Sequence, residues 1–174
     1  MRAPVSLLSE GAIEDLLAAA EKCPPGCFVE VGVYMGGSGY HLAQLAKKQW
    51  RQCFLYDTFS GIPHKSSIDH HPLGDFGNAD YETVKDSIPY AHVIKGVFPG
   101  SSVLMPPVAF AHLDCDQYQS IIESVNYLMH RMSMGGIMWF DDSPVLAGAK
   151  QAVYELFGDS PKLSRNGKHY VEMK

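Results

Sequence analysis

The sequence lacks any apolar run near the ~18 residues that a membrane-spanning helix needs, and prolines interrupt its best candidates. The amino-terminal segment MRAPVSLLSEG has no apolar core of the kind found in secretory signal peptides. Lys and Arg form no block, and 14 basic against 19 acidic residues give a net charge of −5 at pH 7. We therefore expect a protein without a membrane span and without a nucleic-acid partner.

Cysteine is scarce, with four residues in 174: Cys23, Cys27, Cys53 and Cys115. The C-x-x-x-C pair offers too few ligands for a structural zinc site, and the other two cysteines lie in apolar stretches. We expect four reduced thiols in a cytoplasmic protein. With 46% hydrophobic and 19% charged residues, the composition is globular, and the length predicts one domain over residues 1–174.

Apolar runs of strand length alternate with helical patterns along the chain. The pattern predicts strands over 27–31, 53–57, 91–94, 108–113 and 137–140, and helices over 9–22, 38–49, 81–88 and 147–157. This alternation indicates an α/β fold with a mostly parallel sheet and helices on both faces. The Asn166-Gly167 turn predicts a final antiparallel hairpin, which brings the sheet to seven strands.

One further helix is predicted from a capping box, in which Ser120 is the N-cap and Glu123 lies three residues later. Its apolar stripe extends to Met132, and Gly135-Gly136 would end it.

Acidic side chains follow several of the predicted strands. Asp57 ends the second strand, Asp114 and Asp116 follow the fourth, and Asp141-Asp142 follows the fifth. Ligands of an open parallel sheet bind at these carboxyl ends. A single aspartate there can be only a turn or cap residue. Several together raise one another's pKa, and a divalent cation offsets that repulsion; oxygen ligands suit Mg²⁺ or Ca²⁺ better than zinc.

The turn after the first strand is glycine-rich but is not a phosphate loop. It lacks the Gly-Lys-Ser/Thr of a Walker A motif, and G-x-G-x-x-G fits in neither register. The pattern E-x-G-x-x-x-G-x-S lets a ligand approach the backbone closely, which suits a nucleoside without a pyrophosphate. Asp57 is placed to accept hydrogen bonds from ribose hydroxyls. Plain strand-to-helix geometry is the alternative explanation of the turn.

These segments resemble a known family. FVEVGVYMGGSG is similar to motif I of class I S-adenosylmethionine (SAM)-dependent methyltransferases, which have a Rossmann-like fold. LYDTFSGIP, IKGVFPGSS, HLDCDQYQS and GGIMWFDDSPVLAGAKQAV resemble the macrocin O-methyltransferase (TylF-like) family, over about residues 27–157. The resemblance implies methyl transfer from SAM to a sugar hydroxyl, assisted by a divalent metal, usually Mg²⁺.

The resemblance also implies roles for individual residues. The methionine end of SAM would meet Glu30, Gly32, Tyr34, Gly36 and Ser38. The ribose would meet Asp57, Thr58 and Phe59. The metal would bind Asp114, Asp141 and Asp142, with Asp116 beside it and Tyr118 structural. Apart from the resemblance, we expect the proton acceptor to be Asp114, from its place at this edge, or His64 as the first imidazole, with His70 and His71 behind it.

Members of this family usually carry additional N-terminal helices and a lid. Here 26 residues precede the first strand. The acceptor site would then be more open, or completed by the polar stretch 60–78 or by a partner subunit, as in a homodimer. Three alternatives remain: a non-catalytic module with the SAM-binding fold, a metal-dependent hydrolase, and a methyltransferase acting on a catechol-like diol.

Overall fold

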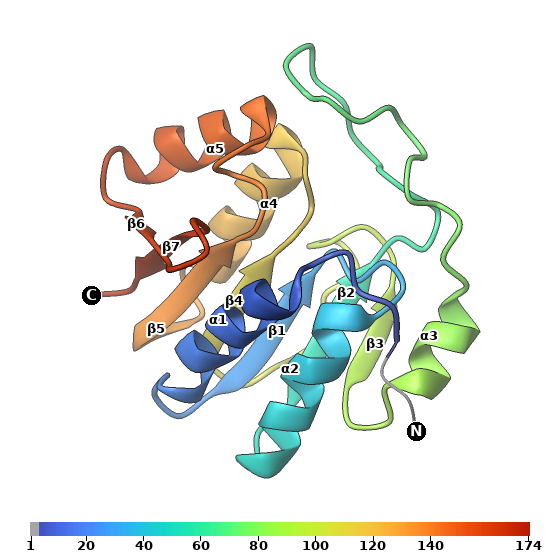
Figure 1. The fold of residues 1–174 in the computed structure, drawn as a ribbon, viewed down its shortest axis with the longest axis vertical. Coiled ribbons are helices and arrows are strands. Elements are labelled where there is room, and N and C mark those ends of the chain that lie inside the picture. Colours follow the sequence, from blue (N-terminus) through green and yellow to red (C-terminus); the bar gives the residue numbers. More distant parts are fainter. Residues whose placement is uncertain (1–3) are drawn as a thin grey trace.

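In the computed structural model, residues 4–174 form a seven-stranded sheet with helices on both faces (Figure 1). The strands are β1 (Cys27–Val31), β2 (Cys53–Asp57), β3 (His92–Lys95), β4 (Val108–Leu113), β5 (Met132–Phe140), β6 (Lys162–Leu163) and β7 (His169–Glu172). Their order is β3-β2-β1-β4-β5-β7-β6. Strands β1 to β5 pair in parallel, whereas β7 is antiparallel to β5 and to β6. The predicted mostly parallel sheet with a terminal antiparallel hairpin is confirmed.

The helices are α1 (Glu10–Glu21), α2 (Gly37–Lys48), α3 (Tyr81–Ser87), α4 (Tyr118–Leu128) and α5 (Ala147–Phe157). Leu16 of α1 and Leu42 of α2 pack in one buried cluster with Phe28 of β1, and α3 adds to this cluster. Helices α4 and α5 cover the opposite face, where Val125 packs in a second cluster. Two hydrophobic cores therefore enclose the sheet, and its central strands are buried on both sides.

Helix α4 begins at Tyr118, three residues before the predicted start, and Ser120 lies buried in its first turn. Its N-cap residue Gln117 makes no side-chain capping bond. Instead, Asp69 from the β2–α3 connection accepts a hydrogen bond from the Tyr118 backbone N–H at 2.9 Å. The predicted capping box was wrong because a distant carboxylate performs that function.

Strand β5 begins at Met132, so Gly135 and Gly136 lie inside a strand and do not end a helix. Met132 pairs with Val108 of β4, and the register shifts between Val108 and Phe110. Gly135 takes a left-handed φ of 78°, which glycine adopts without strain. Pairing with β4 outweighs the low strand propensity of the two glycines, and α4 ends at Leu128.

The segment 58–80 joins β2 to α3 as a long loop that extends beyond the carboxyl ends of the strands (Figure 1). Its middle reaches the amino-terminal end of α4 through Asp69. Among the helices of residues 4–174, none has both the length and the apolar character that crossing a membrane requires.

Candidate active site

A cavity of about 290 Å³ lies at the carboxyl ends of β1, β2, β4 and β5. This is where a parallel sheet binds its ligands. Its walls come from the amino-terminal Leu7 and Leu8, the turn after β1, the long loop after β2, the segments that follow β3, β4 and β5, and helix α4. The cavity is at the lower end of the size range of small-molecule sites.

The turn after β1 is shaped by a close contact with the end of β4. Gly32 has a left-handed φ of 93°. A Cβ at this position would lie 1.8 Å from the carbonyl oxygen of Asp114. Only glycine fits there, so Gly32 allows the ends of β1 and β4 to meet at the cavity.

Asp57, the last residue of β2, holds this turn in place. Its Oδ2 accepts hydrogen bonds from the backbone N–H groups of Val33 and Tyr34, both at 2.7 Å. Its Oδ1 accepts from the N–H of Phe59 at 2.8 Å. These bonds fix Tyr34 at a φ of 49°, an uncommon value for a residue other than glycine. The carboxylate therefore joins the loops after β1 and β2, and it also lines the cavity.

The residues predicted to contact the methyl donor separate into two groups. Gly32, Tyr34, Asp57 and Thr58 line the cavity. Glu30, Gly36, Ser38 and Phe59 are not among its lining residues.

Each member of the second group has a packing role. Glu30 is fully buried, and its Oε1 lies 2.8 Å from Nδ1 of His112 on β4. A Cβ at Gly36 would lie 2.9 Å from Ile88, so Gly36 makes room for the residues around α3. Ser38 is buried at the start of α2. The Phe59 ring packs against Tyr81 of α3, with centroids 5.2 Å apart.

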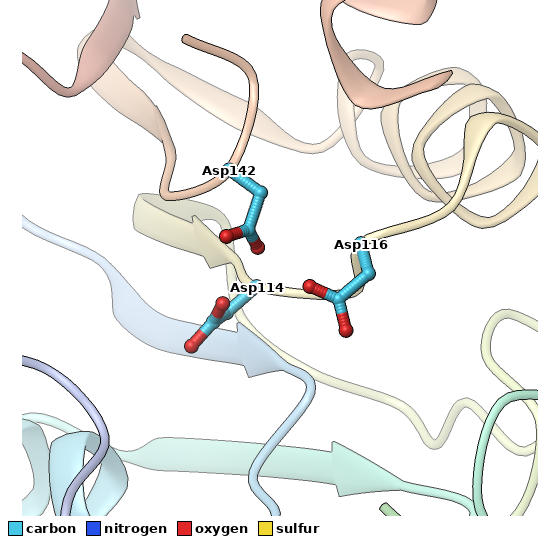
Figure 2. A group of neighbouring side chains, drawn as sticks. All are labelled: Asp114, Asp116 and Asp142. Carbon is cyan, nitrogen blue, oxygen red and sulfur yellow. The ribbon is translucent and has the colours of Figure 1, made fainter. Parts of the chain in front are cut away.

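Three carboxylates meet at the cavity wall. Asp114 follows β4, Asp116 precedes α4 and Asp142 follows β5, and Figure 2 shows these three side chains gathered from three separate segments of the chain. One oxygen of each lies within 4.8 Å of the others. Burial, followed by the charges of Asp141 and Asp142, raises the pKa of Asp114 well above its ordinary value. Burial and a hydrogen bond with Asp142 raise the pKa of Asp116 to about 9.

Asp141, which was predicted as a metal ligand, lines the cavity but is not a member of this triad. Lys168, in the β6–β7 hairpin, donates a hydrogen bond to its Oδ2 at 2.6 Å. Of the predicted metal ligands, Asp114 and Asp142 belong to the triad. Its third member is Asp116.

The donor set fits a hard divalent cation. Oδ2 of Asp142 and Oδ1 of Asp141 are buried and have no hydrogen-bond partner within residues 4–174. Buried carboxylate oxygens without partners are costly, and clustered carboxylates repel one another. Mg²⁺ prefers such oxygen ligands, and it would relieve both costs.

Of the histidines in the long loop, the structure brings His71 to the cavity and not His64. His64 Nε2 is buried and lies 3.8 Å from Glu123 Oε2 of α4. Nδ1 of His71 lies 2.8 Å from Oδ2 of Asp75, and both residues line the cavity. Tyr118 donates its hydroxyl hydrogen bond to Glu155 of α5 at 2.6 Å, a contact between two surface helices.

Residues 10–166 match the family model of macrocin-O-methyltransferase (TylF). The chain belongs to this family. It is an S-adenosylmethionine-dependent O-methyltransferase with the class I fold, as the resemblance implied. Among curated proteins, none matches the sequence.

Solved structures share the fold at low sequence identity. The O-methyltransferase NovP superposes with a TM-score of 0.84 at 19% identity, over 97% of this chain and 82% of NovP. The calicheamicin methyltransferase CalS11 gives 0.74 at 18% identity, over 92% and 77%. An O-methyltransferase from Bacillus cereus, in complex with SAH, gives 0.65 at 13% identity, over 96% and 82%.

Proposed function

We propose that this methyltransferase transfers the methyl group of SAM to a sugar hydroxyl, with a divalent cation bound by Asp114, Asp116 and Asp142. One observation carries the proposal: the carboxylate triad and the glycine-rich turn open into the same cavity. A methyl donor beside the turn and an acceptor beside the triad would therefore meet within one enclosed space.

The donor side of the cavity is built around Asp57. Its carboxylate holds the N–H groups of Val33 and Tyr34, so the backbone of the turn is rigid where a nucleoside would lie against it. Oδ1 accepts one short hydrogen bond, from Phe59, and keeps capacity for a ribose hydroxyl. Thr58 donates to the carbonyl oxygen of Gly61 at 2.7 Å and fixes the next segment of the wall.

The acceptor side is built around the triad. A bound Mg²⁺ would orient the acceptor hydroxyl and lower its pKa. The three carboxylates supply the oxygen ligands, and Lys168 holds Asp141 beside them. The long loop contributes Ile62, Pro63 and Phe76 to the wall, and Leu7 and Leu8 contribute from the amino-terminal segment. These apolar residues limit access of water to the reacting atoms.

A sugar acceptor is supported by the family match and by what is known of the relatives. CalS11 is a TDP-rhamnose 3'-O-methyltransferase. TDP-rhamnose is therefore a rational first acceptor, and 3,4-dihydroxybenzoate represents the catechol-like alternative. We also infer a cytoplasmic location, since all four cysteines are free thiols in the structure. The homodimer stays a prediction from the sequence.

The proposal is tested by following conversion of SAM to S-adenosylhomocysteine with each acceptor, in Mg²⁺ and in EDTA. We expect turnover of TDP-rhamnose that depends on Mg²⁺ and is lost in Asp142→Asn. The matched control is Asp86→Asn, an exposed aspartate of α3. Full turnover in EDTA would contradict the metal role. Binding of SAH without turnover of either acceptor would favour the non-catalytic module.

A further inference from the structure

His71 and Asp75 form a hydrogen-bonded pair in the wall of the cavity. His71 Nδ1 lies 2.8 Å from Asp75 Oδ2, and the two residues are four positions apart in the long loop. Both line the same cavity as the carboxylate triad. The charge of Asp75 contributes to the raised pKa of Asp116, so these two carboxylates are near enough to interact.

Hydrogen bonds within the long loop hold the His71–Asp75 pair in place. The backbone N–H of Ile62 donates to the carbonyl oxygen of Asp75 at 2.9 Å, and the N–H of Gly74 donates to the carbonyl oxygen of Ile62 at 3.0 Å. Lys65 Nζ donates to the carbonyl oxygen of His71 at 3.0 Å. The backbone bonds at Gly74 and Asp75, together with the Lys65 side chain, therefore hold the backbone that carries the imidazole.

Aromatic contacts connect this imidazole to the donor side of the cavity. The His71 ring packs against Phe76 with centroids 4.9 Å apart, and Phe76 packs edge-on against Tyr34 with centroids 5.5 Å apart. Tyr34 belongs to the glycine-rich turn that Asp57 holds. Ring packing therefore links His71 to the methyl-donor turn, and His71 lines the same cavity as the carboxylate triad.

The hydrogen bond to Asp75 sets the chemistry of the ring. A carboxylate in its ionised form only accepts hydrogen bonds, so the contact with Asp75 favours the tautomer of His71 with the proton on Nδ1. In the neutral ring, Nε2 then has a free lone pair. Within residues 4–174, His71 Nε2 has no hydrogen-bond partner, and its side chain keeps 22% exposure. A base oriented by a second group is the usual arrangement for activating an oxygen nucleophile.

We propose that His71 Nε2 accepts the proton of the acceptor hydroxyl during methyl transfer, with Asp75 as its positioning residue. This inference rests on the proposed function. The acceptor O–H bond breaks and its proton moves to Nε2, while the oxygen forms a bond to the methyl carbon. The C–S bond breaks, and its electron pair stays on sulfur to give S-adenosylhomocysteine. The imidazolium then releases its proton to solvent.

The other candidate bases are less well placed. Asp114 belongs to the triad, whose oxygens are proposed to be bound to the cation. His64 lies outside the cavity, beside Glu123. His64 therefore provides a control in the same loop.

The first test needs no acceptor. Nitrogen NMR of ¹⁵N-histidine-labelled protein reports which ring nitrogen carries the proton, and loss of the signal in His71→Gln assigns it. We expect the Nδ1–H tautomer for wild-type His71, and a shift toward the Nε2–H tautomer in Asp75→Asn. An Nε2–H tautomer in the wild-type protein would overturn the inference, because Nε2 would then have no lone pair to accept a proton.

The second test separates catalysis from binding with TDP-rhamnose, SAM and Mg²⁺. We expect His71→Gln to lower kcat by about 10²–10⁴-fold, with KM for TDP-rhamnose and affinity for SAH unchanged. Added imidazole should restore part of kcat in His71→Ala, and His64→Gln should match wild type. A rise in KM alone, or a full kcat in His71→Gln, would overturn the inference.

Failure of the inference is distinguishable from failure of the proposed function. If wild-type protein does not bind SAH, the proposed function itself fails. If it binds SAH but leaves TDP-rhamnose unmethylated, the tautomer measurement still decides whether His71 is built as a proton acceptor.

Discussion

Asp69 Oδ1 accepts a hydrogen bond from the backbone N–H of Tyr118 at 2.9 Å, although the two residues are 49 positions apart. Its Oδ2 accepts from the backbone N–H and the hydroxyl of Ser66, at 2.6 and 2.7 Å. The side chain is buried, and a Cβ at Gly148 of α5 would lie 1.9 Å from its Oδ1. One carboxylate thus caps α4, abuts α5 and anchors the long loop that forms part of the cavity wall.

Asp69→Ala should therefore destabilise the protein and loosen this loop. Loss of a helix cap costs about 0.5–2 kcal/mol, and the loop loses its anchor as well. We expect a lower free energy of unfolding in urea and faster tryptic cleavage after Lys65. Asp86→Ala, at an exposed position of α3, should change neither. Cleavage at the wild-type rate would contradict the anchoring role.

Asp57→Asn should weaken binding of the methyl donor. The amide has only one acceptor oxygen, so it cannot serve the N–H groups of Val33, Tyr34 and Phe59 together. Hydrogen bonds to a charged group contribute about 1.5–3 kcal/mol, and we expect the affinity for SAH to fall about tenfold or more. Calorimetric titration measures this. Asp80→Asn, which keeps an N-cap side chain on α3 away from the cavity, is the control and should leave SAH affinity unchanged.

Glu30→Ala should affect stability and not cofactor affinity. Glu30 pairs with His112 between β1 and β4, where both side chains are fully buried. Removing it leaves a buried imidazole nitrogen unpaired, at a cost of about 1–3 kcal/mol. We expect a lower melting temperature with unchanged SAH affinity. A large loss of SAH affinity in a variant that stays folded would contradict this prediction. It would support the contact with SAM that the family resemblance implied for Glu30.

Asp15 gives a pH-dependent prediction. Partial burial raises the pKa of Asp15, but hydrogen bonds from Ser164 and Asn166 and the charge of Arg165 outweigh it, so the pKa lies below its ordinary value. A lowered pKa stabilises the fold above the unfolded value near pH 4, and this contribution is lost as pH falls. Asp15→Asn should lower the melting temperature slightly at neutral pH, and this deficit should be smaller at about pH 3. An equal deficit at both pH values would contradict this.

The parts of the fold predicted from the sequence depend on local patterns. Strand–helix alternation and the Asn166-Gly167 turn give the strands and the final hairpin, because these signals lie within a few neighbouring residues. The predictions at Ser120 and Gly135 were wrong because residues distant in the sequence determine the structure there. The cap of α4 comes from Asp69 in a distant loop, and pairing with β4 extends β5 through the glycines.

The same distinction applies to the site. Gly32, Asp57, Asp114 and Asp142 follow predicted strands, and the topology alone brings them to one edge. The path of a long loop depends on tertiary contacts that no local pattern contains. The sequence therefore favoured His64, whereas the turn between Ile62 and Gly74 brings His71 and Asp75 to the cavity. The metal role of Asp141 was implied by the family resemblance, and its pairing with Lys168 is a tertiary contact that no local pattern contains.

The central claim is that one cavity holds the methyl donor beside the carboxylate triad. Calorimetric titration of S-adenosylhomocysteine into the protein, once in EDTA and once in Mg²⁺, tests it most directly. We predict binding at about the micromolar level, near −8 kcal/mol, and a separate heat of Mg²⁺ binding that is absent in Asp142→Asn. A folded protein that gives no heat with S-adenosylhomocysteine in either buffer would contradict the account.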